Sequence, residues 1–365
     1  MPVFMDLHIG QGLTAEDIAM AHQMDLKIQG DFDCKCLTYW FDKERGNAYC
    51  LVDAPSKEAV YELHRNSHKQ LPDEIIEVDR RVIKAFLGRI HDPEVVDYMI
   101  DQKIKVFNDP AFRVLLMLRI RDRQRLVHEL GEKKAGEYLN AFEKVSQHQI
   151  LKNNGMAAES GKGVTVATFT SAIQAVICAI DIQNFLHNDL EKIDLKIGIH
   201  AGQPVEKNPG LFENTLRFIR FICCFENSSN IIVSHTVTNL MESAQNSTLL
   251  NSPSVRCISK ADENFLKSLI EVIYNNWQNP LFEMKDYLNT MSMSKSQFYR
   301  RCIETTGHSF NRVLREYRLH QALEKLMKTE KNVAETAFAS GFNSPSYFTK
   351  CFQKHFNIHP SEYLN

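Results

Sequence analysis

The chain has 365 residues, 44% of them hydrophobic, which is enough for two or three domains with buried cores. Its formal net charge of −2 excludes an overall basic field of the kind that draws a protein to nucleic acid. Residues 1–82 carry 9 Lys and Arg against 15 Asp and Glu, whereas residues 262–365 carry 13 against 11. Any affinity for DNA therefore has to come from cations at particular positions.

Cysteine usage and hydropathy indicate where the protein works. Nine cysteines are scattered along the chain, an odd count. The first residues have neither the basic region nor the apolar run of a signal peptide, and no stretch approaches 18 apolar residues. We therefore expect a cytoplasmic protein with reduced thiols and no membrane contact.

The first 80 residues are predicted to alternate between strands and helices. Thr14 stands at a helix start, with acidic residues in the first turn, and Pro55-Ser56 starts a second helix. Strands are expected at residues 3–8, 36–41, 48–52 and 75–78, and helices at 14–29 and 56–67. The order β-α-β-β-α-β is that of a ferredoxin-like α+β sandwich.

The middle of the chain is predicted to be α/β. Residues 81–110 are mixed and contain two Asp-Pro pairs, so we interpret them as a connector. Residues 251–261 have the composition of a linker. Between them we expect strands at 114–120, 164–169 and 195–200, a helix reaching about residue 153, and a helix at 171–186.

From residue 262 onward the pattern is wholly helical and contains two short helix-turn-helix units. Ser294 and Ser344 stand where a serine hydroxyl caps the second helix of each unit, and Gly307 ends the first of these helices. The helices are expected at 283–289 and 295–305 in the first unit, 333–340 and 345–355 in the second, and 310–327 between them.

The second helix of each unit carries side chains that suit base reading. Phe298, Phe348 and Phe352 face inward at helical spacing, which leaves the opposite faces outward. An α-helix fits the major groove, where Arg grips guanine with two hydrogen bonds and Ser, Thr and Tyr reach bases or phosphates. Two such helices on a rigid support can enter successive grooves about 34 Å apart. The candidate DNA-binding residues are Ser296, Tyr299, Arg300, Ser346, Thr349 and Lys350.

Two motifs of this region are specific. Residues 341–352 read Gly-Phe-Asn-Ser-Pro-Ser-Tyr-Phe-Thr-Lys-Cys-Phe, and residues 294–301 read Ser-Lys-Ser-Gln-Phe-Tyr-Arg-Arg. About 100 residues here resemble the arabinose-regulator (AraC/XylS) family, which implies specific binding to duplex promoter or operator DNA. Asn357 stands where that family usually has glycine, and asparagine also tolerates a left-handed conformation. A helical bundle with interaction surfaces only is the alternative.

The middle region carries a second set of motifs. Lys-Ile-Gly-Ile-His-Ala-Gly-Gln-Pro-Val occupies residues 196–205, preceded by Gly-Lys-Gly-Val at 161–164 and followed by Ile-Ile-Val-Ser at 231–234. About 130 residues resemble class III nucleotidyl cyclases. That family holds two metal ions with two aspartates. Arg119 and Lys162 stand at those positions, and a cation cannot ligate Mg²⁺.

The other chemical positions of the cyclase pattern are also changed. The asparagine and arginine that hold the transition state fall on Arg217 and Phe221, or on Arg220 if the alignment shifts by one. We therefore expect a degenerate cyclase-like domain without enzymatic activity. Arg119, Lys162 and Arg217 are candidates for holding a phosphate ligand without metal, which makes a nucleotide a candidate effector. A dimerisation scaffold is the plainer alternative.

The acidic N-terminal region gathers imidazole, thiol and carboxylate side chains. His64 and His68 are four apart and share one face of a predicted helix, while His22 and Asp25 are three apart on the other helix. Imidazole and thiolate suit nickel, zinc or copper, although helix histidines at such spacing are often only solvated. The candidate metal ligands are His22, Cys50, His64, His68, His8 and Asp25.

The same region carries Met-Asp-Leu-His at residues 5–8, Ala-His-Gln-Met-Asp at 21–25 and His-Arg-Asn-Ser-His at 64–68. About 78 residues resemble a small family of ferredoxin-like, nickel-binding dimeric proteins. The resemblance implies the sandwich fold, a dimer and a nickel site, although zinc or copper would accept the same donors. A dimerising sandwich whose histidines are satisfied by protein groups is the alternative.

These patterns predict a multidomain homodimer that regulates transcription by sequence-specific DNA binding and responds to a metal ion or small ligand sensed by its N-terminal domains. Two alternatives stay open: a nucleotidyl cyclase with a DNA-binding tail, and a regulator whose front domains only dimerise. The predicted division is a ferredoxin-like domain at 1–80, a connector at 81–110, a cyclase-like domain at 111–250, a linker at 251–261 and a helix-turn-helix domain at 262–365.

Overall fold

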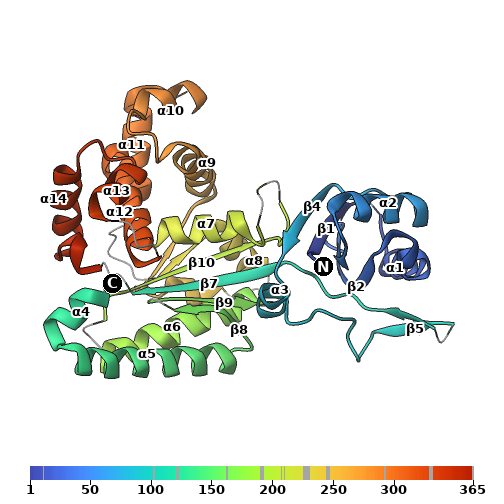
Figure 1. The fold of residues 1–365 in the computed structure, drawn as a ribbon. Helices are drawn as coiled ribbons and strands as arrows, with labels where there is room; N and C mark the ends of the chain where they lie inside the picture. The colour runs from blue at the N-terminus through green and yellow to red at the C-terminus, as the bar shows by residue number, and fades with distance from the viewer. Residues whose placement is uncertain are drawn as a thin grey trace.

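The described residues form three β-sheets and a helical C-terminal region in this computed structural model (Figure 1). Among the described residues, no helix is both long and apolar enough to cross a membrane. The structure describes residues 1–10, 12–101, 103–120, 123–161, 163–189, 193–206, 208, 210–224, 231–243, 247–291, 293–328 and 332–363.

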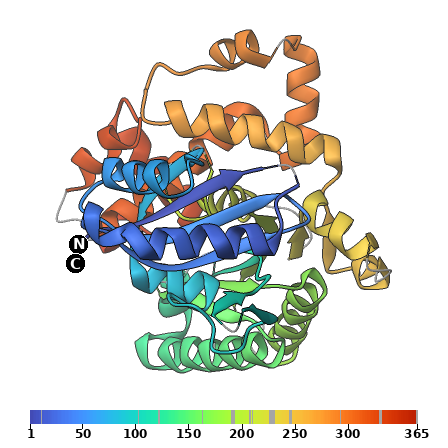
Figure 2. The same ribbon diagram turned by 90° about the vertical axis from the view of Figure 1, so that its right-hand side faces the viewer.

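The N-terminal domain confirms the predicted ferredoxin-like order. Its antiparallel sheet has the strand order β2-β3-β1-β4, and the two helices cover one face, turned toward the viewer in Figure 2. A short 3-10 turn, η1 (Gln29–Phe32), follows the first helix. The elements are β1 (Val3–Ile9), α1 (Ala15–Ile28), β2 (Lys35–Asp42), β3 (Asn47–Asp53), α2 (Lys57–Ser67) and β4 (Glu74–Val78).

Local sequence explains these elements. The hydroxyl of Thr14 accepts a hydrogen bond from the Asp17 backbone and the Asp17 carboxylate accepts one in return, which is a capping box for α1. Ser56 caps α2 in the same position. Along β1 the side chains alternate, so Phe4 packs with the helices while Met5 belongs to the core on the opposite face. Successive even positions of β1 therefore point toward α1 and α2.

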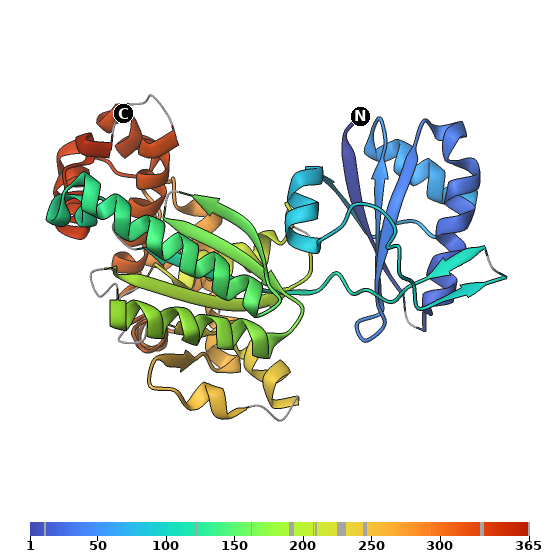
Figure 3. The same ribbon diagram turned by 90° about the horizontal axis from the view of Figure 1, so that it is seen from below.

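The segment predicted as a connector contains regular structure. Asp79 caps α3 (Arg80–Leu87), which ends at Gly88 with φ of 86°. This helix lies between the N-terminal sheet and the middle domain, as Figure 3 shows, and its Phe86 stacks on Phe212 with ring centroids 5.5 Å apart. A two-stranded ribbon, β5 (Tyr98–Ile100) and β6 (Ile104–Val106), follows. The connector thus supplies part of the packing between the two lobes.

The middle domain is a mixed six-stranded sheet with the order β12-β11-β10-β7-β9-β8. In Figure 1, α5 and α6 lie on one face, and α7 lies on the face toward the C-terminal helices. Its strands are β7 (Arg113–Ile120), β8 (Met156–Gly161), β9 (Val164–Phe169), β10 (Leu195–Gly202), β11 (Ile231–Val233) and β12 (Val255–Cys257). Its helices are α4 (Arg123–Leu130), α5 (Glu132–Lys152), α6 (Ala172–Asp189), α7 (Glu213–Ile222) and α8 (His235–Ser243), with the turn η2 (Ser247–Asn251).

Three details of this domain differ from the sequence expectation. The single helix expected up to residue 153 is two helices, because Gly131 adopts φ of 76° between α4 and α5. Strands β8 and β11 and helices α7 and α8 were not predicted. The segment 251–261, expected to be a linker, contains β12, which pairs in parallel with β11 at the edge of the sheet. The C-terminal region is therefore joined to the middle domain through a strand of that domain.

The C-terminal region is all helical, as predicted. The long helix α12 lies between the two helix-turn-helix units. The elements are α9 (Lys260–Asn276), α10 (Met284–Met291), α11 (Lys295–Thr306), α12 (Phe310–Lys328), α13 (Val333–Ala339), α14 (Pro345–Phe356) and the turn η3 (Pro360–Tyr363).

One hydrophobic cluster runs through all three domains. It contains Met5 of β1, Phe86 of α3, Phe212 before α7 and Leu269 of α9, all of which are buried. The second helix-turn-helix unit has a separate core that includes Phe348 and Phe352. The three domains thus share apolar packing.

Candidate functional site

Five side chains from three elements meet between the sheet and the helices of the N-terminal domain. Asp6 and His8 alternate along β1 and so point to the same side, toward the helices. Asp25 comes from α1, His64 from α2, and His68 from the C-cap position one turn later. Four of the predicted metal ligands are thereby brought together. The fifth residue, Asp6, was not among the predictions.

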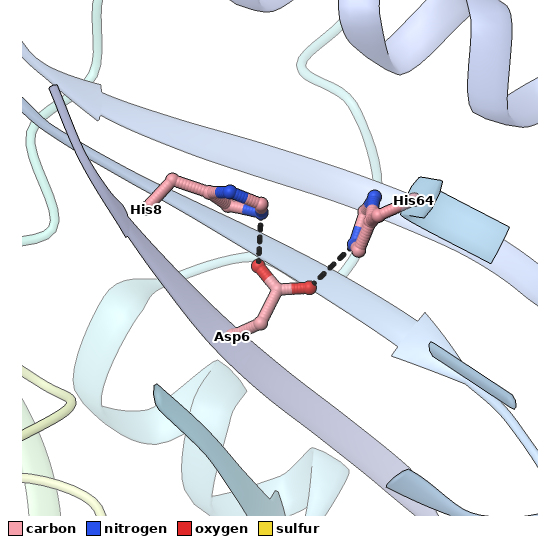
Figure 4. A group of neighbouring side chains, drawn as sticks. All are labelled: Asp6, His8 and His64. Carbon is pink, nitrogen blue, oxygen red and sulfur yellow. Dashed lines mark hydrogen bonds and ion pairs between the residues drawn. The ribbon is translucent and has the colours of Figure 1, made fainter. Parts of the chain in front are cut away.

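Asp6 lies between two imidazoles (Figure 4). Its Oδ2 is 2.9 Å from Nε2 of His64, and its Oδ1 is 3.3 Å from Nε2 of His8. The backbone N–H of Cys50, on the neighbouring strand β3, donates to the same Oδ1 at 3.0 Å. This carboxylate is therefore fixed by groups from three different elements.

Asp25 lies on the other side of the His64 ring. Nδ1 of His64 is 3.0 Å from Nε2 of His68 and 3.3 Å from Oδ2 of Asp25. Nε2 of His68 is 3.5 Å from Oδ1 of Asp25. His64 thus bridges two groups of donors, Asp6–His8–His64 and Asp25–His64–His68, and within each group the donor atoms lie within 4.8 Å of one another.

Burial makes the electrostatics of this cluster strong. Asp6 and His64 are both 0% exposed. Burial alone would raise the pKa of Asp6, but the charges of His64 and His8 hold that pKa below its usual range. Burial acts to lower the pKa of His64, and the carboxylates of Asp6 and Asp25 more than offset this and raise it to about 10. In the absence of a metal, a proton on His64 therefore balances part of the carboxylate charge.

Two polar atoms of the cluster are buried without a hydrogen bond among the described residues. They are Nε2 of His8, which lies 3.3 Å from a carboxylate oxygen of Asp6, and Oδ1 of Asp25, which lies 3.5 Å from Nε2 of His68. A buried polar atom without a hydrogen bond costs about 1–3 kcal/mol. Both atoms are good ligand atoms for a late first-row divalent metal, so the donor set fits such an ion.

Two further predicted ligands lie beside the cluster and outside both donor groups. His22 is buried, with Nε2 3.8 Å from Oδ2 of Asp92 and its ring 5.4 Å from that of Tyr39. Burial lowers the pKa of His22 and raises that of the Cys50 thiol well above its ordinary value. Cys50 contacts the cluster through its backbone N–H.

The predicted DNA-reading side chains are exposed on the second helix of each helix-turn-helix unit. Ser296, Tyr299 and Arg300 lie on the outer face of α11. On α14, Ser346 and Lys350 are exposed and Thr349 is half-buried. The inward-facing aromatic side chains behind them, Phe298, Phe348 and Phe352, are all 0% exposed.

The ends of these helices have the predicted caps. Ser294 forms a capping box with Gln297, and α11 ends at Gly307 with φ of 76°. The hydroxyl of Ser344 accepts from the backbone of Tyr347, and α14 ends at Asn357 with φ of 58°. Asn357 is therefore left-handed, at the position where the AraC/XylS family usually has glycine.

Two of the three candidate phosphate ligands lie within the described residues, and each of them has partners of its own. Arg119 on β7 is 7% exposed, and its Nη2 lies 3.0 Å from Nδ1 of His320 on α12. Arg217 on α7 pairs with Glu213 at 2.6 Å, and its guanidinium carbon lies 3.3 Å from the ring centroid of Tyr274. Lys162 lies outside the described residues. Arg119 and Arg217 therefore have different partners. Arg119 contacts α12 through His320, and Arg217 contacts α9 through Tyr274.

Helix α11, which carries the first set of predicted DNA-reading side chains, contacts the middle domain. The Arg256 guanidinium of β12 donates to the carbonyl of Thr305 at 3.1 Å, at the C-terminal end of α11. Arg301 of the same helix lies 3.1 Å from Asp262 of α9. Glu263 of α9 in turn accepts from the backbone and hydroxyl of Thr236 at the start of α8. These contacts fix α11 and α9 relative to the central sheet.

The two ends of the chain are similar to known protein families. Residues 287–365 match the family described as helix-turn-helix domain, and residues 4–78 match the family described as nickel responsive protein SCO4226-like. The solved structure of SCO4226 from Streptomyces coelicolor A3(2) is 39% identical, covering 21% of this chain and 94% of that chain, with a TM-score of 0.20.

Two curated relatives are similar over shorter stretches. Histidine kinase P4 of Formosa agariphila is 32% identical over 114 residues, which is 31% of this chain and 8% of that protein. The HTH-type transcriptional activator RhaS of Mannheimia succiniciproducens is 29% identical over 96 residues, which is 26% of this chain and 35% of that protein. The chain thus spans about a third or less of the length of these relatives.

Proposed function

We propose that this chain, in which an SCO4226-like domain precedes a helix-turn-helix domain of the AraC type, is a transcription regulator whose DNA binding responds to a divalent metal ion. The observation that carries the proposal is the buried cluster of three histidines and two aspartates in the same chain as two capped, exposed reading helices. Duplex DNA is the proposed partner, and the active form is proposed to be a homodimer.

The DNA-binding part of the proposal rests on α11 and α14. Each presents a cation, Arg300 or Lys350, on its exposed face, while its buried phenylalanines hold the helix against α12 or its neighbours. Because the region is only weakly basic, these placed cations would supply most of the contacts with bases and phosphates. Both helices belong to one chain, so a single protomer would read two adjacent half-sites.

The metal-binding part rests on the donor set. His8, Asp25, His64 and His68, together with Asp6, are the residues that would hold the ion, with His22 and Cys50 as further candidates beside them. Nickel fits the mixed imidazole and carboxylate donors, and zinc or copper would also accept them. Once bound, the ion would supply positive charge where the protein now holds two buried carboxylates.

A catalytic role for the middle domain is not part of the proposal. At one of the two positions where a cyclase places a metal-binding aspartate, Arg119 is buried and hydrogen-bonded to His320. A guanidinium at this place repels a cation and at the same time links the sheet to α12. We therefore propose that the middle domain holds the sensor and the DNA-binding region in a fixed relation.

The test combines metal titration with DNA binding on the full chain. Calorimetry with Ni²⁺ and Zn²⁺ should show one tight site that is lost in a His64→Ala/His68→Ala double variant and kept in the His148→Ala control, because His148 is exposed on α5. Fluorescence anisotropy with a DNA site selected from a random pool should show an affinity that changes with metal. Equal, weak metal binding by the native chain and the double variant would remove the site, and tight binding with unchanged DNA affinity would remove its sensory role.

A further inference from the structure

A cleft of about 810 Å³ lies where the three domains meet. Leu7, Ile9, Asp73 and Glu74 line it from the N-terminal domain. From the middle domain it is lined by residues of β10 and α7 and, between them, by Gln203, Val205, Glu206 and Asn208. The third wall is one face of α9, which includes Lys267 and Glu271. The volume is that of a site for a small organic molecule. It is separate from the histidine cluster, which lies on the opposite face of the N-terminal sheet.

The side chains that line the cleft offer mainly negative charge to a ligand. Four carboxylates face the cleft, of which Asp73 accepts a hydrogen bond from the backbone N–H of Ile9 at 2.7 Å and Glu206 accepts one from the side-chain amide of Asn214. The two cations of the lining are each paired with a carboxylate on their own helix. Arg217 lies 2.6 Å from Glu213 and is stacked on Tyr274, and Nζ of Lys267 lies 2.7 Å from Glu263. The four carboxylates in the lining are those of Asp73, Glu74, Glu206 and Glu271.

A buried imidazole in the lining points independently to a ligand. His200 is 4% exposed, and its Nδ1 lies 2.8 Å from the hydroxyl of Ser234. Among the described residues no hydrogen bond forms to its Nε2. Burial lowers the pKa of His200 to about 3, so the ring is neutral and carries one donor and one acceptor at neutral pH. Gln203, whose Oε1 accepts from the Tyr49 hydroxyl, offers its amide N–H groups nearby.

We propose that this cleft binds a small organic cation, an amine or guanidine compound of polyamine size. Its charged groups would pair with Glu74, Glu206 and Glu271, and a polar group would reach the free nitrogen of His200. Hydrogen bonds from a cation to a carboxylate are shorter and stronger than neutral ones. Because the three walls belong to three domains, an occupant stabilises the arrangement in which these domains are closed on one another.

The test is calorimetry on the full chain with spermidine as the cationic probe and succinate as the anionic one. A Glu74→Gln/Glu271→Gln double variant should bind spermidine at least about tenfold more weakly than the native chain. A Glu62→Gln/Glu283→Gln double variant is the matched control, since both side chains are exposed carboxylates outside the lining. The control should bind like the native chain. Succinate should bind to none of them.

A variant that fills the space checks the location. Ser268, half-buried on α9, faces the cleft, so Ser268→Trp should abolish spermidine binding while leaving the thermal unfolding midpoint and Ni²⁺ binding unchanged. Failure of spermidine to bind the native chain would overturn the proposal. Equal spermidine affinities in the two glutamine double variants would also overturn the proposal. Binding of succinate would overturn it as well, because an anion would then pair with Arg217 and Lys267. The binding of spermidine and succinate depends neither on DNA nor on the histidine cluster, so the proposed metal response is tested separately.

Discussion

Replacement of His200 should change how the stability of the protein depends on pH. The ordinary pKa of histidine is 6.5, and burial lowers that of His200 to about 3 in the folded protein. Below pH 6.5 the unfolded chain therefore binds a proton that the folded chain does not, and folding loses free energy as the pH falls toward 3. Between pH 7.5 and pH 5.0 the loss is about 2 kcal/mol, at about 1.4 kcal/mol per pH unit over the steep part.

The assay is urea unfolding of the native chain and of His200→Asn at both pH values. Asparagine is neutral throughout and can keep the contact with Ser234, so the variant should lose about 2 kcal/mol less than the native chain on acidification. Carboxylates also titrate in this range, but they contribute equally to both proteins and cancel in the difference. The same loss in both proteins would refute the idea that His200 is buried and neutral.

Three further predictions concern the DNA interface, the fold and the middle domain. Arg300→Ala should weaken binding to a selected DNA site by about 1–3 kcal/mol in a gel shift at fixed salt, whereas Arg125→Ala, on α4, should not. Gly341→Ala should cost about 2 kcal/mol or more in thermal unfolding, because Gly341 has φ of +75° and its added Cβ would lie 2.4 Å from the Trp277 carbonyl oxygen; an unchanged midpoint would contradict this geometry. The purified chain should form no cyclic nucleotide from ATP or GTP with Mg²⁺ or Mn²⁺ if Arg119, as the sequence motifs predict, replaces a metal-binding aspartate, and measurable turnover would show that this prediction is wrong.

Local signals made both ends of the chain predictable from sequence. In the N-terminal domain strands alternate with capped helices, and Thr14 and Ser56 mark the starts of α1 and α2 in the structure. In the C-terminal region Ser294 and Ser344 do the same for α11 and α14. Where the capping residue, the spacing of apolar residues and the terminating residue all indicate the same helix, the tertiary contacts of the fold favour that helix too.

The parts that escaped prediction depend on contacts between distant residues. Strand β8 reads Met-Ala-Ala-Glu-Ser-Gly and lacks the branched and aromatic residues that favour strands, so only its pairing with β9 makes it one. Strand β12 is three residues long and acquires its structure from β11. The pairing of Arg119 with His320 joins residues 201 positions apart, which no spacing rule reaches.

The members of the histidine and aspartate cluster were selected from sequence, except for one residue. His64 and His68 were visible because four residues separate them on a helix. Asp6 was not chosen, although it stands two residues before His8 on a strand, where a period of two places both side chains on one face. That face points toward α2 because β1 pairs with β3 on one side and β4 on the other. The order of the strands in the sheet, which the spacing of residues does not give, therefore places Asp6 in the cluster.

The hydrophobic cluster that runs from β1 through α3 and α7 to α9 limits how the protein can be dissected. Regulators with separable modules tolerate chimeras in which one sensor is exchanged for another at a flexible joint. A cut before α9 in this chain would expose Phe265 and Leu269 on one fragment and their apolar partners on the other. A chimera should therefore keep all the residues of the shared hydrophobic cluster from one parent protein. Limited proteolysis should cleave first in the loops that lie outside this cluster.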